Sequence, residues 1–436
     1  MKVMSLIAAA LAASLVSQAS ATTLTIATVN ANEIITMQKL SDDFTKSNPD
    51  ISLRWVTLEE NVLRQKVTTD IATKGGQFDI ITIGNYEVPI WAKLNWLKPF
   101  NDLGPDYDVA DLLPAISASL SFDKKLYAAP FYGEGAMIHY RTDLMEKAGL
   151  TMPASPDWDF VKVAADKMTD RKNEIYGICL RGKAGWGLNM ALLTSMVNSF
   201  GGRWFDEHWK PQFDQPEWKE TLNFYVKLMK ADGPPGAASN SFTENQALFQ
   251  QGKCGMWIDA TVAAGSLIDP KQSKVADHVG WAVAPSGKGI NNHGNWLWAW
   301  ALAVPASSQN TEAAQKFIAW ATSKHYEQLV AESRGWANVP PGTRTSLYKN
   351  PDYIKASPFA TPTLNAINAA NTQQPTVKPV PYTGGQFVAI PEFQGLGEAV
   401  GQTFSAALTG QLTVDQALQQ AQQIATRTMA KAGYLK

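Results

Sequence analysis

Three observations predict an α/β fold with two domains. The chain of 436 residues is longer than one hydrophobic core usually serves, so two domains of about 200 residues each are expected. Apolar runs with strand character alternate with segments of helical periodicity, which favours a parallel sheet. Short polar loops at 30–33 and 84–87 follow two of these strands. Ligands of such sheets collect beyond the carboxyl ends of the strands, so both loops are candidate binding loops.

The first residues have the pattern of an export signal. Lys2 precedes a nearly continuous apolar run at 3–16, and Ala19-Ser20-Ala21 has the small-x-small form that precedes cleavage. We expect a signal peptide of residues 1–21, cut between Ala21 and Thr22. A retained anchor is the less favoured alternative, because polar threonines follow at once. No later run approaches the roughly 18 apolar residues of a membrane helix. The expected location is the periplasm of a double-membraned bacterium.

The first domain begins with alternating strands and helices. Residues 23–30 predict a buried strand, and apolar residues at helical spacing then predict a helix over 34–44. Alternation at 51–55 predicts a second strand. A helix follows over 60–74, and the apolar run 78–83 predicts a third strand.

A hairpin and a change of domain are expected next. Strand-like segments at 120–122 and 126–132 flank a turn, and 136–140 reads as another strand. Gly133-Glu134-Gly135 interrupts this extended stretch. The interruption is typical either of a crossing between two domains or of a β-bulge.

The second domain is expected from Asp143 to Lys274, where helical patterns dominate. Three later segments resume alternation: a strand at 281–285, a strand at 297–304 and a helix at 311–323. The last two look like a continuation of the first domain. The chain is therefore expected to cross between the domains more than once.

Composition narrows the class of ligand. The net charge is −1 and only 18% of residues are charged, so no bulk field recruits nucleic acid or an anionic membrane. The chain has 15 tryptophans, which is rich for its length. Indoles serve core packing, or they line a pocket that offers flat apolar faces and a donor to a sugar or polyol. The two cysteines, Cys179 and Cys254, form either a disulfide in an oxidising compartment or two separate buried thiols.

Catalytic and cofactor signatures are missing. The five histidines show no spacing suited to a zinc helix, and neither a Gly-x-Ser-x-Gly elbow nor a P-loop occurs. We therefore expect no enzyme activity, no cofactor and no metal. A glycosidase needs only two carboxylates, so a secreted sugar-acting hydrolase stays open as an alternative.

Several segments together resemble a known family. These segments are the strand-loop-helix opening, 78–81, the hairpin at 126–130 leading to 140–144, the segment 249–257, and 296–305. They resemble extracellular solute-binding proteins of the maltose-binding type, along most of the chain after the signal. Within that family, 294–300 and 132–135 resemble the sorbitol and mannitol binding subgroup of ABC importers.

The resemblance implies an α/β, two-lobed periplasmic binding protein fold. Each lobe is then a mixed sheet flanked by helices, and the ligand lies in the interlobe cleft. The implied divisions are an N-terminal lobe of 22–132 plus 286–325, a C-terminal lobe of 136–282 plus 330–436, and hinge crossings near 133–135, 283–285 and 326–329.

The implied function is capture of a small neutral polyol, namely mannitol, sorbitol or arabitol, for import. The implied partners are that ligand and the membrane permease subunits of an ABC importer, with no nucleic acid, and the protein is expected to be a monomer. The same receptor fold binding a different small sugar is the second alternative.

The resemblance assigns twelve residues to the ligand cleft. A polyol is all hydroxyl, so carboxylates, arginines and amides suit its hydroxyls, and indoles suit its C–H faces. The assigned residues are Asn32, Glu33, Asn85, Tyr86, Glu134, Arg181, Trp186, Asp259, Asn295, Trp296, Trp298 and Trp336.

Structural roles compete at some of these positions. Asn32 and Asp259 could instead cap helices, whereas Asn85-Tyr86 and Glu134 could be ordinary turn residues. Two indoles of the segment 296–298 share one face of a strand, which could belong to the core or to the cleft. The neighbouring Asn295 favours the cleft mouth.

Overall fold

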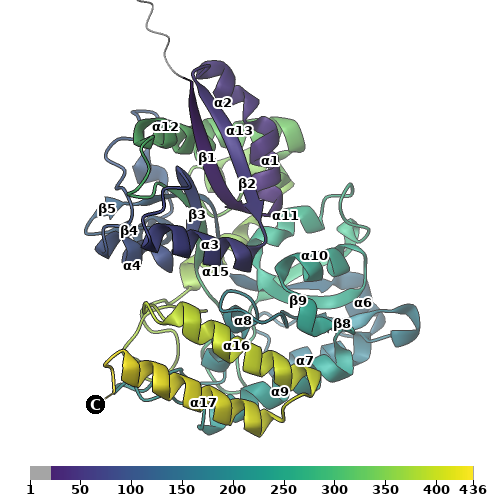
Figure 1. Cartoon of the computed structure of the whole chain (residues 1–436). Helices are drawn as coiled ribbons and strands as arrows, with labels where there is room; N and C mark the ends of the chain where they lie inside the picture. The colour runs from purple at the N-terminus through teal and green to yellow at the C-terminus, as the bar shows by residue number, and fades with distance from the viewer. Residues whose placement is uncertain (1–20, 436) are drawn as a thin grey trace, which may run out of the picture.

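The structure, a computed structural model, describes residues 21–435, and its chain forms two sheets that are each covered by helices (Figure 1). The expected signal peptide lies, except for Ala21, outside the described residues. Within residues 21–435 no helix is both long and apolar enough to span a membrane. The predicted α/β class, with two mixed sheets, is confirmed.

The N-terminal sheet has five strands in the order β2-β1-β3-β11-β6. Strand β1 runs parallel to β2 and β3, whereas β11 is antiparallel to both β3 and β6. The strands are β1 (Thr22–Val29), β2 (Ile51–Leu58), β3 (Ile80–Gly84), β6 (Ala128–Glu134) and β11 (Trp298–Ala303). Their apolar runs are buried because helices cover the sheet.

Helices before and after the second lobe in sequence cover this sheet. They are α1 (Asn32–Leu40), α2 (Asp42–Ser47), α3 (Glu60–Ala72), α4 (Glu87–Lys93), α5 (Pro114–Ser119), α12 (Thr311–Ala321) and α13 (Lys324–Arg334), with a small hairpin of β4 (Ser121–Phe122) and β5 (Lys125–Leu126). The single helix predicted over 34–44 is two helices, divided at Ser41. Glu59 caps α3 by accepting hydrogen bonds from the backbone amides of Asn61 and Val62.

The C-terminal sheet has four strands in the order β10-β7-β9-β8. They are β7 (Ala136–Arg141), β8 (Tyr176–Cys179), β9 (Cys254–Ala260) and β10 (Val279–Val283). Only the β8–β9 pair is parallel. The helices of this lobe are α6 (Thr142–Lys147), α7 (Trp158–Met168), α8 (Asn189–Ser199), α9 (Pro216–Asp232), α10 (Phe242–Gln250), α11 (Ala264–Leu267), α14 (Pro351–Ala356), α15 (Ala360–Ala369), α16 (Phe393–Thr409) and α17 (Val414–Lys431).

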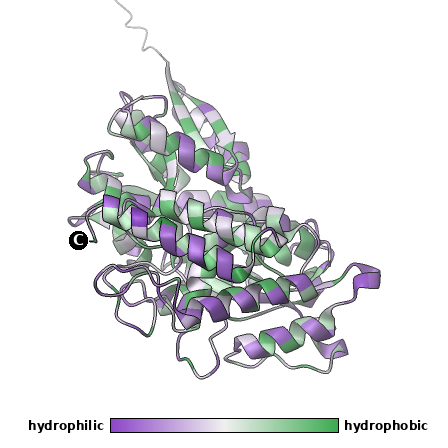
Figure 2. Ribbon diagram, turned by 60° about the horizontal axis from the view of Figure 1, so that its bottom comes forward, coloured by the Kyte–Doolittle hydropathy of each residue, from purple (hydrophilic) through white to green (hydrophobic). Residues whose placement is uncertain are grey.

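The last two helices, α16 and α17, lie side by side on the outside of the C-terminal lobe (Figure 1). In α17 the buried residues recur at helical spacing: Ala417, Leu418, Ala421, Ala425 and Met429. Hydrophilic and hydrophobic residues accordingly mix along the helices in Figure 2. Each helix buries one apolar stripe and leaves its other face to solvent.

The chain first passes between the sheets at Gly135, because β6 continues through Glu134 and β7 starts at Ala136. Close packing explains the glycines here. A Cβ on Gly133 would lie 2.4 Å from the carbonyl oxygen of Gly342, and one on Gly135 would lie 2.8 Å from the Cβ of Ala366. The predicted crossing at 133–135 is thus a tightly packed passage, and not a loose loop.

Segment 341–345 is hydrogen-bonded to residues beside the N-terminal sheet. The backbone amide of Gly133 donates to the carbonyl of Pro341 (2.9 Å), and that of Leu113 donates to the carbonyl of Thr343 (2.9 Å). These amides need partners beside the N-terminal sheet, and segment 341–345 supplies them. We therefore propose that this segment belongs to the N-terminal lobe, in place of the expected assignment to the C-terminal lobe with a crossing near 326–329. We propose that the third passage lies between α13 and α14, close to residue 350.

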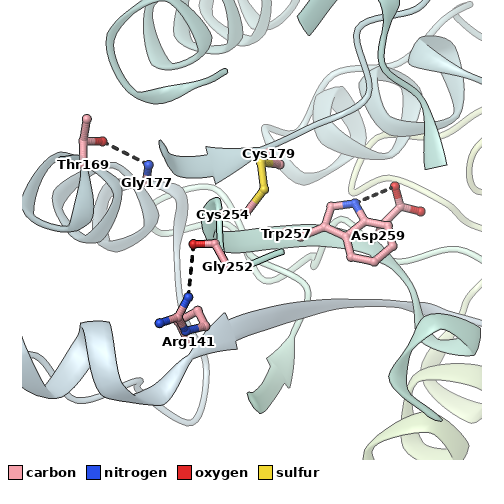
Figure 3. Close-up of a disulfide and its surroundings, with 8 residues drawn as sticks. All are labelled: Arg141, Thr169, Gly177, Cys179, Gly252, Cys254, Trp257 and Asp259. Atoms are coloured by element: carbon pink, nitrogen blue, oxygen red, sulfur yellow. Dashed lines mark hydrogen bonds between the residues drawn. A yellow bond between two sulfur atoms is a disulfide. The ribbon is translucent and has the colours of Figure 1, made fainter. Parts of the chain in front are cut away.

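A disulfide joins the neighbouring strands β8 and β9 (Figure 3). It links Cys179, at the end of β8, to Cys254, at the start of β9, and both residues are fully buried. Of the two sequence alternatives, the structure therefore has the bridge. Further along β9, Trp257 donates to the carboxylate of Asp259 at 3.2 Å.

Acid should destabilise the fold through His139 on β7. Burial lowers the pKa of His139 from 6.5 to about 4, although the Ala260 carbonyl and Asp259 act in the opposite direction. The unfolded chain binds this proton near pH 6.5, so stability should fall as the pH drops from 6.5 towards 4. At pH 4.5 we expect a loss of about 2 to 3 kcal/mol from this group.

Denaturant titrations of wild type and His139→Gln at pH 7 and pH 4.5 measure this contribution. The variant should lose less stability than wild type between the two pH values, since other acid-sensitive groups are common to both. Parallel losses in the two proteins would rule out His139 as the cause.

Candidate functional site

A cavity of about 250 Å³ lies between the two lobes, and both lobes contribute to its lining. This volume is below the range of about 300 to 1,000 Å³ typical of drug-sized ligands, so the cavity suits a small solute. The charged and aromatic side chains that line it are Glu33, Glu59, Glu60, Arg64, Tyr132, Glu134, Arg181, Trp186, Phe242, Glu244, Trp296, Trp298 and Trp300.

The floor of the cavity is one face of the β6–β11 strand pair. Trp298 lies opposite Glu134 in the ladder, and Trp300 lies opposite Tyr132. Because side chains alternate along a strand, these four point to the same face of the sheet. The alternation of indoles noted in the sequence thus places aromatic faces beside a carboxylate.

One helix of the N-terminal lobe brings both charges to the cavity. Glu60 and Arg64 are one turn apart on α3, and Arg64 donates to Glu60 at 3.2 and 3.0 Å. It also donates to the buried Glu87 at 2.9 Å. The guanidinium lies over the rings of Trp186 (4.0 Å) and Trp300 (4.6 Å). A guanidinium between indoles forms a rigid cationic wall.

A second arginine enters from the C-terminal lobe, just after β8. Arg181 donates to both carboxylate oxygens of Asp259, at 2.8 and 2.6 Å, and to the carbonyl of Gly187 at 2.9 Å. Burial disfavours its charge, but Asp259 outweighs that effect and raises the pKa of Arg181. Asp259 therefore orients Arg181 from behind.

The carboxyl of Glu134 is strongly affected by its surroundings. Burial raises its pKa well above the ordinary value of 4.5, and the carboxylates of Asp259, Glu60 and Glu33 act in the same direction. The guanidinium of Arg181 opposes them. Burial likewise raises the pKa of Glu33. In the cavity, burial and neighbouring negative charges therefore disfavour the ionised form of these carboxyl groups. The same groups are good hydrogen-bond partners for hydroxyls.

The structure brings seven of the twelve predicted residues to the cavity: Asn32, Glu33, Glu134, Arg181, Trp186, Trp296 and Trp298. Asn32 is the first residue of α1 and makes no capping bond, so the capping alternative is wrong for it. Trp336 does not line the cavity and lies in a 3-10 turn, Trp336–Asn338, packed against the core.

The remaining four predicted residues lie behind the lining and make structural contacts. Asn85 donates to the carbonyl of Leu297 and accepts from the amide of Ala299, both at 3.1 Å, which fixes the start of β11. The Tyr86 hydroxyl donates to the carbonyl of Ile390 at 2.8 Å, and its ring lies 4.7 Å from that of Trp186. Asp259 does not cap a helix, since it holds Arg181.

Asn295 lies at the crossing between the lobes, where it bonds to the backbone, and it does not lie at the cleft mouth. Its side-chain oxygen accepts from the amide of Ala136 at 2.9 Å, and its amide group donates to the carbonyl of Ala366 at 2.8 Å. Because both the oxygen and the NH2 group of this side chain already bond to backbone groups, the side chain is not available to a ligand.

Sequence reasoning missed several lining residues, namely Glu60, Arg64, Tyr132, Ser241, Phe242, Trp300 and Gln386. The signal for Tyr132 and Trp300 was present, since each is two residues from a predicted neighbour on the same strand. Nothing in the sequence distinguished Arg64 from a surface arginine of a solvated helix. Gln386 comes from a loop that no pattern linked to the cavity.

The two lobes also meet directly beside the cavity. Lys183 of the C-terminal lobe donates to Glu59, the cap of α3, at 3.0 Å. The Arg64–Trp186 contact likewise joins the lobes. The two lobes are therefore in contact with each other beside the cavity, as in a closed form of the protein. In the described part of the chain, no group of three or more His, Cys, Asp or Glu side chains is placed to hold a metal ion.

Replacing Gly84 by alanine should displace the floor of the cavity. A Cβ there would lie 2.0 Å from a ring carbon of Trp298, so the indole must move. We expect a loss of about 1 to 3 kcal/mol in the free energy of unfolding, the usual cost of overpacking. Denaturant melts and the near-UV circular dichroism of the indoles measure the effect.

The matched control is Gly395→Ala in α16, where a Cβ meets nothing within 4 Å. It should stabilise the protein by roughly 0.5 to 1 kcal/mol, because alanine favours a helix. Equal stability of the two variants would contradict the assigned contact of Gly84 with Trp298.

Sequence comparison relates the chain to bacterial binding proteins. Residues 30–328 match the family described as bacterial extracellular solute-binding protein. The chain is 54% identical over 432 residues to a mannitol-binding protein of Pseudomonas aeruginosa, a match that covers 99% of this chain and 98% of the relative. It is 27% identical over 293 residues to an erythritol/L-threitol-binding protein of Mycolicibacterium smegmatis, covering 63% of this chain and 61% of that protein.

Solved structures show the same architecture. A solute-binding protein from Agrobacterium vitis with bound D-mannitol is 68% identical and superposes with a TM-score of 0.94, over 95% of this chain and all of that one. A second, from Agrobacterium radiobacter in complex with ribitol, is 25% identical with a TM-score of 0.81, over 93% and 98% of the two chains.

Proposed function

Because the chain belongs to the bacterial extracellular solute-binding protein family, we propose that it captures a small polyol, D-mannitol first, and delivers it to an ABC importer. The observation that supports this most is the likeness at 68% identity to a protein with D-mannitol bound. Its partners are then that ligand and the permease subunits of the importer. The export signal read in the sequence supports the periplasm as its location.

The cavity supports this proposal through its chemistry. Hydroxyls both donate and accept, and the cavity offers acceptors on Glu33 and Glu134 and donors on Arg181. Trp186, Trp296 and Trp298 supply flat faces for the C–H side of a carbon chain. We propose that the seven predicted residues in the lining contact the polyol directly, with Glu60, Arg64, Tyr132 and Trp300 as further wall residues.

The residues behind the lining are proposed to act through others. Asp259 orients the guanidinium of Arg181 by hydrogen bonds, and Tyr86 packs against the ring of Trp186. Asn85 fixes the start of β11, which carries Trp298. Residues of this kind hold the lining side chains in the positions from which they contact the ligand at the right distance. The hydrolase alternative is set aside, since the relatives named above are binding proteins.

Melting temperatures of the ligand-stripped mature protein test the proposal. The panel consists of D-mannitol, sorbitol, arabitol, glucose, maltose and an amino acid. A ligand that binds the folded state, present at 100 times its Kd, stabilises by about 2.7 kcal/mol and must raise the midpoint. We expect the largest rise with D-mannitol. A rise only with glucose or maltose would favour a different sugar, and no rise with any compound would refute the binding function.

A further inference from the structure

Glu134 is a buried carboxyl without a partner. Its side chain is 5% exposed and lines the cavity. Among residues 21–435 no side chain or backbone amide makes a hydrogen bond or ion pair with its carboxylate oxygens. Buried carboxylates in proteins are normally paired, so this group is arranged to meet something that enters the cavity.

The cationic groups nearby already have partners other than Glu134. Arg181 uses three of its five N–H donors on Asp259 and Gly187, and Arg64 uses three of its five on Glu60 and Glu87. Lys183 pairs with Glu59 at the edge of the cavity. On the side of Glu33, Arg334 bonds to Thr36.

The lining therefore has more carboxyls than cations. Glu33, Glu60 and Glu134 all face the cavity, against Arg64 and Arg181, and Glu87 and Asp259 stand directly behind those two arginines. A neutral polyol leaves this imbalance as it is, so Glu134 must either keep a proton or remain an unbalanced charge. The burial that raises the pKa of Glu134 favours the proton in the empty cavity.

We propose that the cavity also takes a cationic polyol, an alditol with an ammonium group in place of one hydroxyl, and that this ammonium pairs with Glu134. The inference rests on the proposed function in that a polyol enters this cavity. An ammonium brings three donors and the missing positive charge. Trp298, which lies opposite Glu134 on the same face of the sheet, offers its ring to the cation.

Binding of such a ligand should favour the ionised form of the Glu134 carboxyl. Pairing with the ammonium lowers the pKa of this carboxyl relative to the empty cavity, so any proton that it carries in the free protein passes to the buffer. Glu33, Glu60 and Asp259 face Glu134 with negative charge, and Arg181 faces it with positive charge. These charges act on a bound ammonium as well, so the effect of Glu134 itself is measured by comparing Glu134→Gln with a variant of a paired carboxylate, Glu60→Gln.

Calorimetric titration with D-mannitol and with 1-amino-1-deoxy-D-mannitol tests the inference at pH 7. Each ligand is titrated into the mature wild-type protein in phosphate and in Tris, whose ionisation enthalpies differ. The amine should bind at least as tightly as D-mannitol, and any proton release on binding, measured by the difference in binding heat between the two buffers, should be larger for the amine. In Glu134→Gln the affinity for the amine should fall by about tenfold more than that for D-mannitol. In the control Glu60→Gln, whose carboxylate is already paired with Arg64, the affinity for the amine relative to D-mannitol should fall less than it does in Glu134→Gln.

The outcomes separate the two proposals. D-mannitol binding with amine binding that is ten times weaker overturns the cationic ligand alone, as does an equal loss of both ligands in Glu134→Gln. Amine binding without D-mannitol binding overturns D-mannitol as the ligand and supports the cationic polyol. Binding of neither overturns both. If Glu134→Gln does not fold, the relative affinity of the wild type for the amine and for D-mannitol decides.

Discussion

Replacing Asp259 by alanine should lower the free energy of unfolding by about 3 to 5 kcal/mol, the usual cost of breaking a buried ion pair from one side. Asp259 is fully buried, and the side chain of its partner Arg181 is 8% exposed. The variant leaves that guanidinium without a counter-charge. It also removes the acceptor of the Trp257 indole and of the Ala260 amide. Guanidinium chloride melts with unchanged slope measure the loss.

An exposed ion pair provides the control for this variant. Lys219 pairs with Asp415 at 2.8 Å, with both side chains more than half exposed. Lys219→Ala should cost less than about 1 kcal/mol. Should Asp259→Ala cost no more than this control, the buried pair is not the brace assigned to it.

Removing both cysteines should cost about 4 kcal/mol of unfolding free energy. The bridge between Cys179 and Cys254 closes a loop with a sequence separation of 75, and a loop of that length restricts the unfolded chain by about this amount in the chain-entropy model. The double variant Cys179→Ala/Cys254→Ala keeps small apolar side chains at two fully buried positions. Its native fold should persist, with a lower denaturation midpoint.

A reducing agent supplies the matching comparison for the disulfide. Wild type unfolded and refolded with reductant should fall to the stability of the double variant, while the variant itself should not respond. A double variant as stable as oxidised wild type would show that the bridge does not restrict the unfolded chain.

Much of the fold was predictable because local patterns and tertiary structure agree. The alternation of apolar runs at 23–30, 51–55 and 78–83 predicted three strands, and β1, β2 and β3 confirm them. The return to the first sheet at 297–304 was also predicted, and β11 confirms it. The place of 341–345 was not predictable, since these residues form no helix or strand and are held by backbone bonds to distant amides.

The site was predictable where chain position alone determines what a side chain faces. Glu33 follows a strand at the edge where ligands gather, and Trp298 alternates with its neighbours on a strand. The prediction failed where side chains from two different elements lie one behind the other, because only the tertiary packing determines which of them reaches the cavity. Asp259 and Tyr86 were placed in the right region, but Arg181 and Trp186 stand in front of them.

The position of β11 in the N-terminal sheet determines when that sheet can form. β11 lies between β3 and β6, although it follows β6 by more than 160 residues of sequence. A chain made from its N-terminus therefore holds β1, β2 and β3 on one side of an empty strand position and β6 on the other, while the whole sheet of the other lobe is synthesised. Such long-range pairing is slow, because a large loop must close before the contacts form. Until Ala303 has been made, the nascent chain exposes two unpaired strand edges, which are templates for aggregation.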